Sequence, residues 1–214
     1  MGRKKIRPKF IFQASTLDYL HCLQSMTAWS SLLLKTNNNK KYVDFLKWML
    51  EHDYLRTYDE LSITKISKLS GFTTAKISKY LKEIYDDIFD LNEREPDLFC
   101  KKGETKVVLH MKYYDNHCYF SISLPIIPRV HERFNFFFAK AKMGWYNFWV
   151  KDIQYDIDNN DTDISIFLIG GILNQYREMA VEKAIFEGRI SHIEKYDKYD
   201  FEIDDIILGR NRDF

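Results

Sequence analysis

Residues 63–84 read ITKISKLSGFTTAKISKYLKEI, a pattern typical of two short helices joined at a glycine. Ile66 and Leu69 share one face of the first helix, and Gly71 follows where a sharp turn needs the positive φ that glycine tolerates. Thr73 is a natural N-cap for the second helix. The apolar residues of that helix recur at helical spacing: Ile77, Leu81 and Ile84. The stretch therefore predicts two helices that pack at an angle.

These residues resemble the winged helix-turn-helix superfamily, as found in bacterial regulators. The family repeats an apolar residue, a small residue, a turn glycine and two later apolar residues, which here are Ile66, Ser67, Gly71, Ile77 and Leu81. Ser67 stands where alanine is usual, so we expect its hydroxyl to bond a backbone carbonyl one turn back. The resemblance covers residues 38–124 and implies three helices, a β-hairpin wing and a DNA-binding face.

The flanks of the motif fit this expectation. Upstream, an apolar stripe predicts the first of the three helices: Tyr42, Phe45, Leu46, Met49 and Leu50. Downstream, residues 107–114 and 118–124 are rich in β-branched and aromatic side chains, and residues 115–117 are good turn formers. We expect these two segments to form the hairpin.

A further strand is expected at residues 98–101, followed by a turn at residues 102–104. Either this turn or the one at Asn116 can be the wing tip, and the sequence does not choose between them.

The resemblance implies a DNA-binding site on the second helix and the hairpin turns. Lysines neutralise phosphates, and residues near the start of a recognition helix reach base edges, a role that suits Thr74 and Ser78. The candidate residues are Thr73, Thr74, Lys76, Ser78, Lys79, Lys82, Lys102, Lys106 and Asn116. The competing interpretation is a solvated lysine row. Acidic residues later in the same helix repel phosphate, so only its first two turns can approach DNA: Glu83, Asp86, Asp87 and Asp90.

The amino-terminal segment GRKKIRPK is a basic arm. Its cations, among them Arg3, Lys4 and Lys5, can follow a phosphate backbone or enter a minor groove. A solvated tail is the alternative. The apolar stretch that follows is too short for a signal peptide.

Composition sets broad limits. The chain has 214 residues, of which 45% are hydrophobic and 16% aromatic, enough for a packed core. The formal net charge is only +1, although nucleic-acid-binding domains are commonly basic. The charge is unevenly distributed, since residues 1–125 carry 20 Lys and Arg against 15 Asp and Glu, while residues 126–214 carry 12 against 16. The basic excess thus lies with the expected DNA-binding part.

Several classes of protein are disfavoured. Three distant cysteines without a CxxC pair argue against a disulfide scaffold or a zinc site, and favour a reducing cytoplasm. No catalytic constellation, metal site or cofactor motif stands out, so we do not expect an enzyme. The longest apolar run, residues 164–173, is too short to span a membrane.

The two ends of the chain extend the central unit. In residues 1–37 we expect a strand at 9–13 and, after a capping signature at 15–18, one helix with apolar residues from Leu17 to Leu33. That helix packs either on a sister subunit, giving a homodimer, or on its own domain, and both options stay open.

Residues 125–214 form an aromatic-rich carboxy-terminal α+β subdomain after two prolines. Residues 145–156 are expected to be extended, and residues 172–187 to form a helix. Its inward residues would be Ile172, Tyr176, Met179 or Ala180, and Ala184. A short surface helix and a tail are expected at residues 192–205. The aromatic residues of 134–149 either form core or stack on bases or on a flat ligand.

The expected fold is α+β and mainly α: a winged helix-turn-helix unit at 38–124, with an N-terminal helix before it and an α/β extension after it. The expected function is sequence-specific binding of double-stranded DNA by a transcriptional regulator. Two alternatives remain: a replication or maintenance initiator of a mobile element, and a winged-helix scaffold that binds proteins without DNA.

Overall fold

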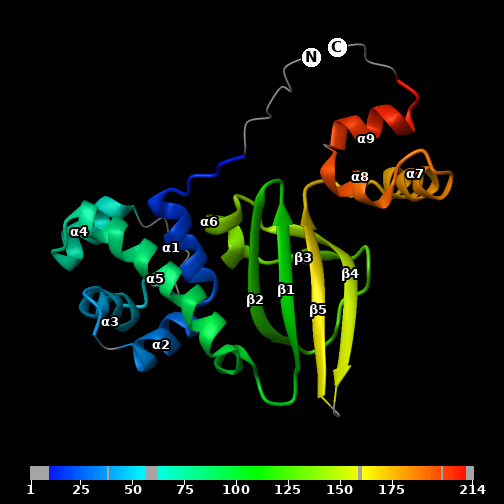
Figure 1. Cartoon of the computed structure of the whole chain (residues 1–214). Helices are drawn as coiled ribbons and strands as arrows, with labels where there is room; N and C mark the ends of the chain where they lie inside the picture. Colours follow the sequence, from blue (N-terminus) through cyan, green and yellow to red (C-terminus); the bar gives the residue numbers. More distant parts are fainter. Residues whose placement is uncertain (1–9, 38, 56–61, 159–160, 199, 211–214) are drawn as a thin grey trace. The chain divides into compact units, whose positions relative to one another are not determined.

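The computed structural model describes residues 10–37, 39–55, 62–158, 161–198 and 200–210. The chain divides into two compact units, Met1–Gly171 and Ile172–Phe214. The first unit combines helices with a curled five-stranded sheet (Figure 1), and the second contains helices only in its described part. The protein is therefore α+β, whereas a winged-helix unit as such is not shown.

Two helices, rather than one, precede the expected DNA-binding region. They are α1 (Thr16–Ser25) and α2 (Thr27–Thr36), and the predicted capping box at Ser15 and Asp18 opens α1. Met26 leaves helical geometry with φ −138° and ψ 55°. The Thr27 hydroxyl, at the start of α2, donates a hydrogen bond to the Leu55 carbonyl at 2.5 Å. The prediction of a single continuous helix was wrong.

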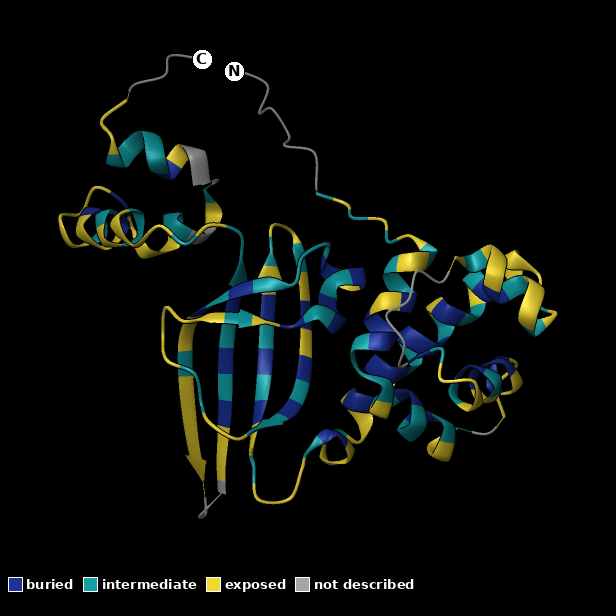
Figure 2. Ribbon diagram, turned by 180° about the vertical axis from the view of Figure 1, so that it is seen from behind, coloured by how far each residue is buried: buried dark blue, intermediate teal, exposed yellow. Residues whose placement is uncertain are grey.

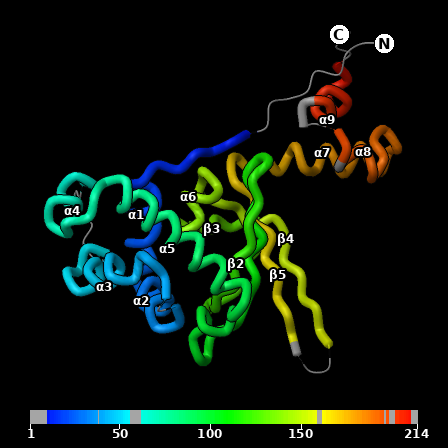
Figure 3. The backbone as a smooth tube through the Cα atoms, turned by 60° about the vertical axis from the view of Figure 1, so that its left-hand side comes forward, coloured from blue at the N-terminus to red at the C-terminus, as the bar shows by residue number. Residues whose placement is uncertain are grey.

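The next three helices were predicted well. They are α3 (Val43–Glu51), α4 (Ile63–Ser70) and α5 (Thr74–Arg94). The buried residues of α5 recur at helical spacing along its whole length, which keeps one side of this long helix against the protein. Figure 3 shows α1 and α5 side by side, and the two helices are in contact.

The sheet has the order β2-β1-β5-β4-β3. Its strands are β1 (Thr105–Tyr113), β2 (Asn116–Leu124), β3 (Arg133–Asn135), β4 (Asn147–Asp158) and β5 (Asp161–Gly170). Neighbouring strands are antiparallel except β1 and β5, which are parallel. The expected hairpin is thus the β1–β2 pair, built into a larger sheet. The predicted boundary at residue 124 falls inside the first compact unit, because β1 and β2 share this sheet with β3–β5.

Three local expectations were wrong. The β1–β2 turn comprises Tyr114 and Asp115, because Asn116 and His117 already pair within the hairpin. The expected strand at 98–101 does not form: residues 98 and 99 end a 3-10 helix, η1 (Pro96–Phe99), whose first residue is a proline without an N–H to donate. The described residues of the expected strand at 9–13 form no strand.

The core lies between the helices and one face of the sheet. Alternate residues of the central strands are buried, as Figure 2 shows. Trp29 of α2 packs against Phe120 of β2 with ring centroids 4.8 Å apart, and against Phe138 at 4.9 Å. Phe138 lies in the short helix η2 (Phe137–Ala139), which is followed by α6 (Lys140–Met143). Aromatic packing therefore joins helices and sheet.

The outer edge of β2 is covered by α5. The side-chain amide of Asn92 donates to the Ser121 carbonyl at 2.7 Å, and the Ser121 N–H donates to the Asn92 side-chain oxygen at 2.8 Å. Asn92 is only 3% exposed. The side-chain amide of Asn92 thus makes the two hydrogen bonds to β2 that the backbone of a neighbouring strand would make.

The opposite edge of the sheet is different. β3 pairs only with residues 147–149 of β4, so the rest of the outer edge of β4 has no strand partner among the residues that the structure places. Side chains along this segment are mostly exposed.

The second unit contains α7 (Gln175–Phe186), α8 (His192–Asp197) and α9 (Asp200–Ile207). The predicted helix is confirmed, and Ala184 is buried as expected. Ile172, Tyr176 and Met179 are exposed instead, because Val181 and Ala184 form the side of α7 that packs in the core of this unit.

We predict that Asn92→Ala lowers the free energy of unfolding by about 2 kcal/mol or more, since both backbone groups of Ser121 lose their partner. Urea denaturation of the full chain measures the effect. Asn135→Ala, at an exposed position in β3, is the matched control and should change stability by about 0.5 kcal/mol or less. Equal effects of the two substitutions would contradict the role of Asn92.

Candidate nucleic-acid interface

The turn between α4 and α5 has the geometry that the sequence predicts. Gly71 has a φ of 75°, in the left-handed region, and its N–H donates to the Ser67 carbonyl at 3.0 Å. The Thr73 hydroxyl accepts a hydrogen bond from the Lys76 N–H at 3.4 Å and so caps α5. α4 ends at Ser70 and α5 begins at Thr74, so the turn between them has three residues.

Two details of this turn differ from expectation. The Ser67 hydroxyl donates to the Phe72 carbonyl at 2.7 Å, not to a carbonyl one turn back, because the left-handed Gly71 folds residue 72 back toward α4. Leu69 is 52% exposed, while Ile66 is fully buried. Ile63 and Ser70 are half-buried. The packed side of α4 therefore extends from Ile66 toward these two residues and away from Leu69.

An aromatic cluster fixes the angle between the helices. The Phe72 ring meets Phe45 of α3 at 5.5 Å and Tyr80 of α5 at 6.0 Å, and Phe45 lies 5.9 Å from Tyr80. The three rings come from α3, the turn and α5. They hold the start of α5 against α3.

The first two turns of α5 present an exposed surface. Thr73, Thr74, Lys76 and Lys79 are all exposed. These four residues, which we call the α5 head, belong to a helix N-terminus, where the backbone N–H groups and the helix dipole favour anions.

Ser78 lies elsewhere. It accepts a hydrogen bond from the Thr16 hydroxyl of α1 at 2.9 Å and is partly buried. At 100° per residue, Ser78 and Lys76 are about 160° apart around α5. Ser78 therefore does not share an open face with Lys76, and α1 covers its side of the helix.

The lysines of α5 differ in their partners. Lys79 lies 3.7 Å from Glu83, and Lys82 forms an ion pair with Asp86. The hydrogen bond to Asp86 raises the pKa of Lys82. Lys76 forms no ion pair with any residue in the described ranges. Exposed pairs four residues apart on a helix contribute only about 0.3–0.5 kcal/mol, so a phosphate can replace these carboxylates.

The candidate DNA-binding residues of the two turns do not lie together in the structure. Asn116 lies beside the β1–β2 turn and donates to the Met143 carbonyl at 3.2 Å. Lys102 and Lys106 lie at the opposite end of β1, and Lys106 pairs with Asp97 at 2.6 Å. The two ends of β1 are about 26 Å apart at 3.3 Å per residue.

Lys102 and Lys106 follow the carboxy-terminal end of α5, where the chain enters the sheet (Figure 1). α5 has 21 residues and is about 30 Å long, so these lysines lie far from the α5 head. The β1–β2 turn is tied to residues that lead into α1, because the Phe10 N–H donates to the Asp115 carboxylate at 2.9 Å. Arg3, Lys4 and Lys5 lie outside the described residues.

Sequence reasoning missed Lys65 and Lys68 of α4, which are both exposed. In a helix-turn-helix the first helix crosses the DNA backbone, where lysines contact phosphates. The spacing of three residues between Lys65 and Lys68, which places both on one side of a helix, is the sequence feature that could have identified them.

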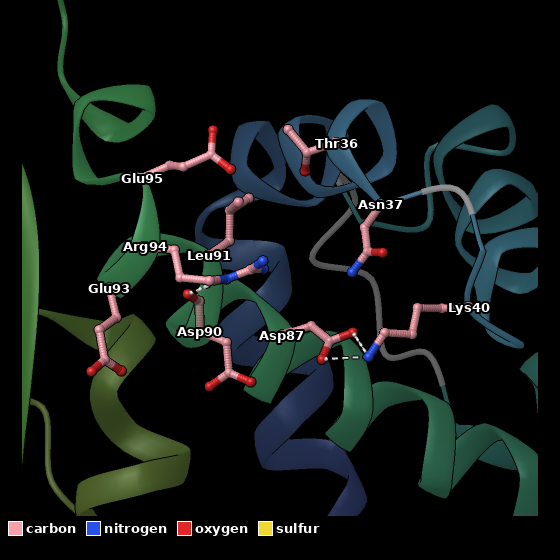
Figure 4. Close-up of a pocket in the computed structure, with 9 residues that line it drawn as sticks. All are labelled: Thr36, Asn37, Lys40, Asp87, Asp90, Leu91, Glu93, Arg94 and Glu95. Atoms are coloured by element: carbon pink, nitrogen blue, oxygen red, sulfur yellow. Dashed lines mark hydrogen bonds and ion pairs between the residues drawn. The ribbon is translucent and has the colours of Figure 1, made fainter.

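A cavity of about 470 Å³ lies between the end of α2 and the second half of α5 (Figure 4). Lys40 reaches Asp87 at 3.1 Å, and the Tyr42 hydroxyl donates to the same carboxylate at 2.6 Å. Burial, followed by this hydrogen bond, raises the pKa of Tyr42. Four carboxylates line the cavity and disfavour a phosphate ligand: Asp87, Asp90, Glu93 and Glu95.

We predict that Gly71→Ala lowers the free energy of unfolding by about 1 kcal/mol, because alanine disfavours a positive φ. A β-carbon at this position meets no atom within 4 Å, so crowding adds nothing. Gly71→Asn should cost less, since asparagine tolerates the left-handed region better. Urea denaturation of both variants provides the test, and an alanine variant as stable as the wild type would refute it.

Other chemistry is limited in the described part of the chain. No group of three or more His, Cys, Asp or Glu residues there can hold a metal ion, and none of its helices is long and apolar enough to cross a bilayer. Burial raises the pKa values of Cys22 and Cys118 to about 12, so both thiols are protonated at neutral pH.

No family model, curated protein or solved structure matches this chain.

Proposed function

We propose that this chain is a transcriptional regulator that binds double-stranded DNA in a sequence-specific manner, with the start of α5 in the major groove. One observation carries the proposal: the α5 head is exposed at the N-terminus of a helix that a glycine turn and an aromatic cluster hold in place. A fixed projecting helix is what groove recognition requires.

The charges support contact by the first two turns of α5. Lys76 and Lys79 can meet phosphates, and the helix dipole adds to their attraction. Thr74, at the start of the helix, can reach base edges with its hydroxyl or methyl group. Further along α5, Glu83, Asp86 and Asp90 repel a backbone, so the helix enters the groove by its end.

The first helix of the motif completes the interface. Lys65 and Lys68 are exposed on α4 and can contact phosphates on the flank of the groove. Lys102 and Lys106 lie at the far end of α5 and are not part of this surface. A homodimer would place two α5 heads on a two-fold symmetric site, and selection of bound sequences from random duplexes would reveal such symmetry.

We predict that Lys76→Ala and Lys79→Ala each weaken binding to all duplexes and reduce the slope of log K against log salt concentration by about one unit. Fluorescence anisotropy with labelled duplexes over a series of salt concentrations measures both quantities. Lys102→Ala is the matched control and should leave the slope unchanged. If all three variants behave like the wild type, α5 does not bind DNA phosphates.

We predict that Thr74→Ala changes the preference among duplexes, because a lost base-edge contact alters discrimination by about 1–3 kcal/mol at one position. Site selection with wild type and variant measures this preference. Ser78→Ala is the control, since Ser78 lies against α1 and should leave the preference unaltered. The same selected motif for Thr74→Ala and wild type would count against base reading by this residue.

A further inference from the structure

The outer face of the sheet, opposite the helices, carries a row of aromatic rings. The strand register sets His110 of β1 opposite Tyr119 of β2 on one side and opposite Phe167 of β5 on the other. The His110 ring stacks on Phe167 at 4.6 Å with an interplanar angle of 19°, and meets Tyr119 at 5.1 Å. We call Tyr119, His110 and Phe167 the aromatic row.

This row faces away from the core. The neighbouring residues Leu109, Phe120 and Ile166 are buried against the helices, so alternation along the strands turns the row outward. Tyr119 is 65% exposed, although large aromatic side chains are usually buried.

The centre of the row is held rigidly. The His110 Nε2 lies 3.1 Å from the Ser165 hydroxyl, which fixes the ring on the sheet. Partial burial lowers the pKa of His110, which favours the neutral imidazole over the charged form. The His110 ring lies between the rings of Phe167 and Tyr119, and Tyr119, at the end of the row, is the most exposed of the three.

A second row, nearer the β1–β2 turn, carries cations. Lys112 pairs in register with His117 and Ile169, and Trp149 pairs with Ile169 and Arg133. The Arg133 guanidinium lies 4.9 Å from the centre of the Trp149 ring. Lys112 and Arg133 are exposed, so positive charge borders the aromatic row along one side.

Acidic residues lie at the β4 end of the aromatic row and beyond it, toward the end of the β4–β5 hairpin. The Asp152 carboxylate, opposite Phe167, accepts hydrogen bonds from the Ile153 N–H at 2.9 Å and from the Gln154 amide at 3.1 Å. Asp156 and Asp163 lie further toward the end of the β4–β5 hairpin. This distribution of charge orients a polyanion toward the row of Lys112 and Arg133.

We propose that this outer face binds single-stranded DNA, with a base stacked on the exposed Tyr119 ring at the end of the aromatic row and phosphates along Lys112 and Arg133. Unpaired bases offer their flat faces to aromatic side chains, and such stacking tolerates any sequence. Bases in a duplex are already stacked on each other and cannot bind in this way. The site is therefore separate from the proposed duplex interface on α5, and that proposed function enters only in the choice of DNA over RNA.

The test compares the full chain with two tyrosine variants by anisotropy of a labelled oligothymidine of about ten nucleotides. We expect Tyr119→Ala to weaken binding roughly tenfold and Tyr119→Phe to retain it, because the ring rather than the hydroxyl stacks. Tyr155→Ala is the matched control, since Tyr155 is 57% exposed but lies on the other face of the sheet. Lys112→Ala should weaken binding and reduce its salt dependence.

Thermal unfolding of each variant verifies that its fold is intact. Equal binding by Tyr119→Ala and Tyr155→Ala, or no binding of oligothymidine by the wild type, would overturn the proposal. Tighter binding of an oligouridine of the same length would overturn the assignment to DNA. Duplex binding, measured in parallel, should respond to Lys76→Ala and not to Tyr119→Ala, so failure of one site is distinguishable from failure of the other.

Discussion

Burial of one side of α5 is the constraint on which the first compact unit depends. Along its 21 residues this helix contacts α1, α2, α4, η1 and β2. The Tyr85 hydroxyl, fully buried, donates to the Phe138 carbonyl at 2.7 Å, and Asn92 pairs with Ser121. The carboxy-terminal half of α5 is thereby fastened to η2 and β2, and the first two turns of the helix expose the α5 head.

This arrangement separates two kinds of surface. We propose the α5 head for a duplex, because a helix end with positive charge can enter a groove. We propose the outer sheet face for unpaired bases, because an exposed aromatic ring can stack on them. α1 covers the side of α5 that carries Ser78 and leaves Lys76 and Lys79 open. The acidic half of α5 and the cavity beside it limit where a polyanion can bind.

Local signals in the sequence predicted much of the helical part. The capping residues Ser15 and Thr73 and the turn at Gly71 act through neighbours in the chain, so their spacing reveals them. Long-range contacts were not accessible in this way. The hydrogen bond between Thr16 and Ser78 joins residues 62 positions apart, and the parallel pairing of β1 with β5 spans most of the sheet's sequence. These contacts decide which predicted site residues are open and make the hairpin part of a larger sheet.

The open edge of β4 has a consequence for how the protein behaves at high concentration. A strand edge with free N–H and C=O groups is a template for other chains, and proteins counter this hazard with charge and irregularity. Here Asp152, Asp156 and Asp158 follow one another along the edge, and a register shift between Val150 and Asp152 disturbs its regularity. Two such edges would bring carboxylates against each other. Repulsion between these carboxylates thus disfavours edge-to-edge pairing of two molecules along β4, an edge that α5 does not cover.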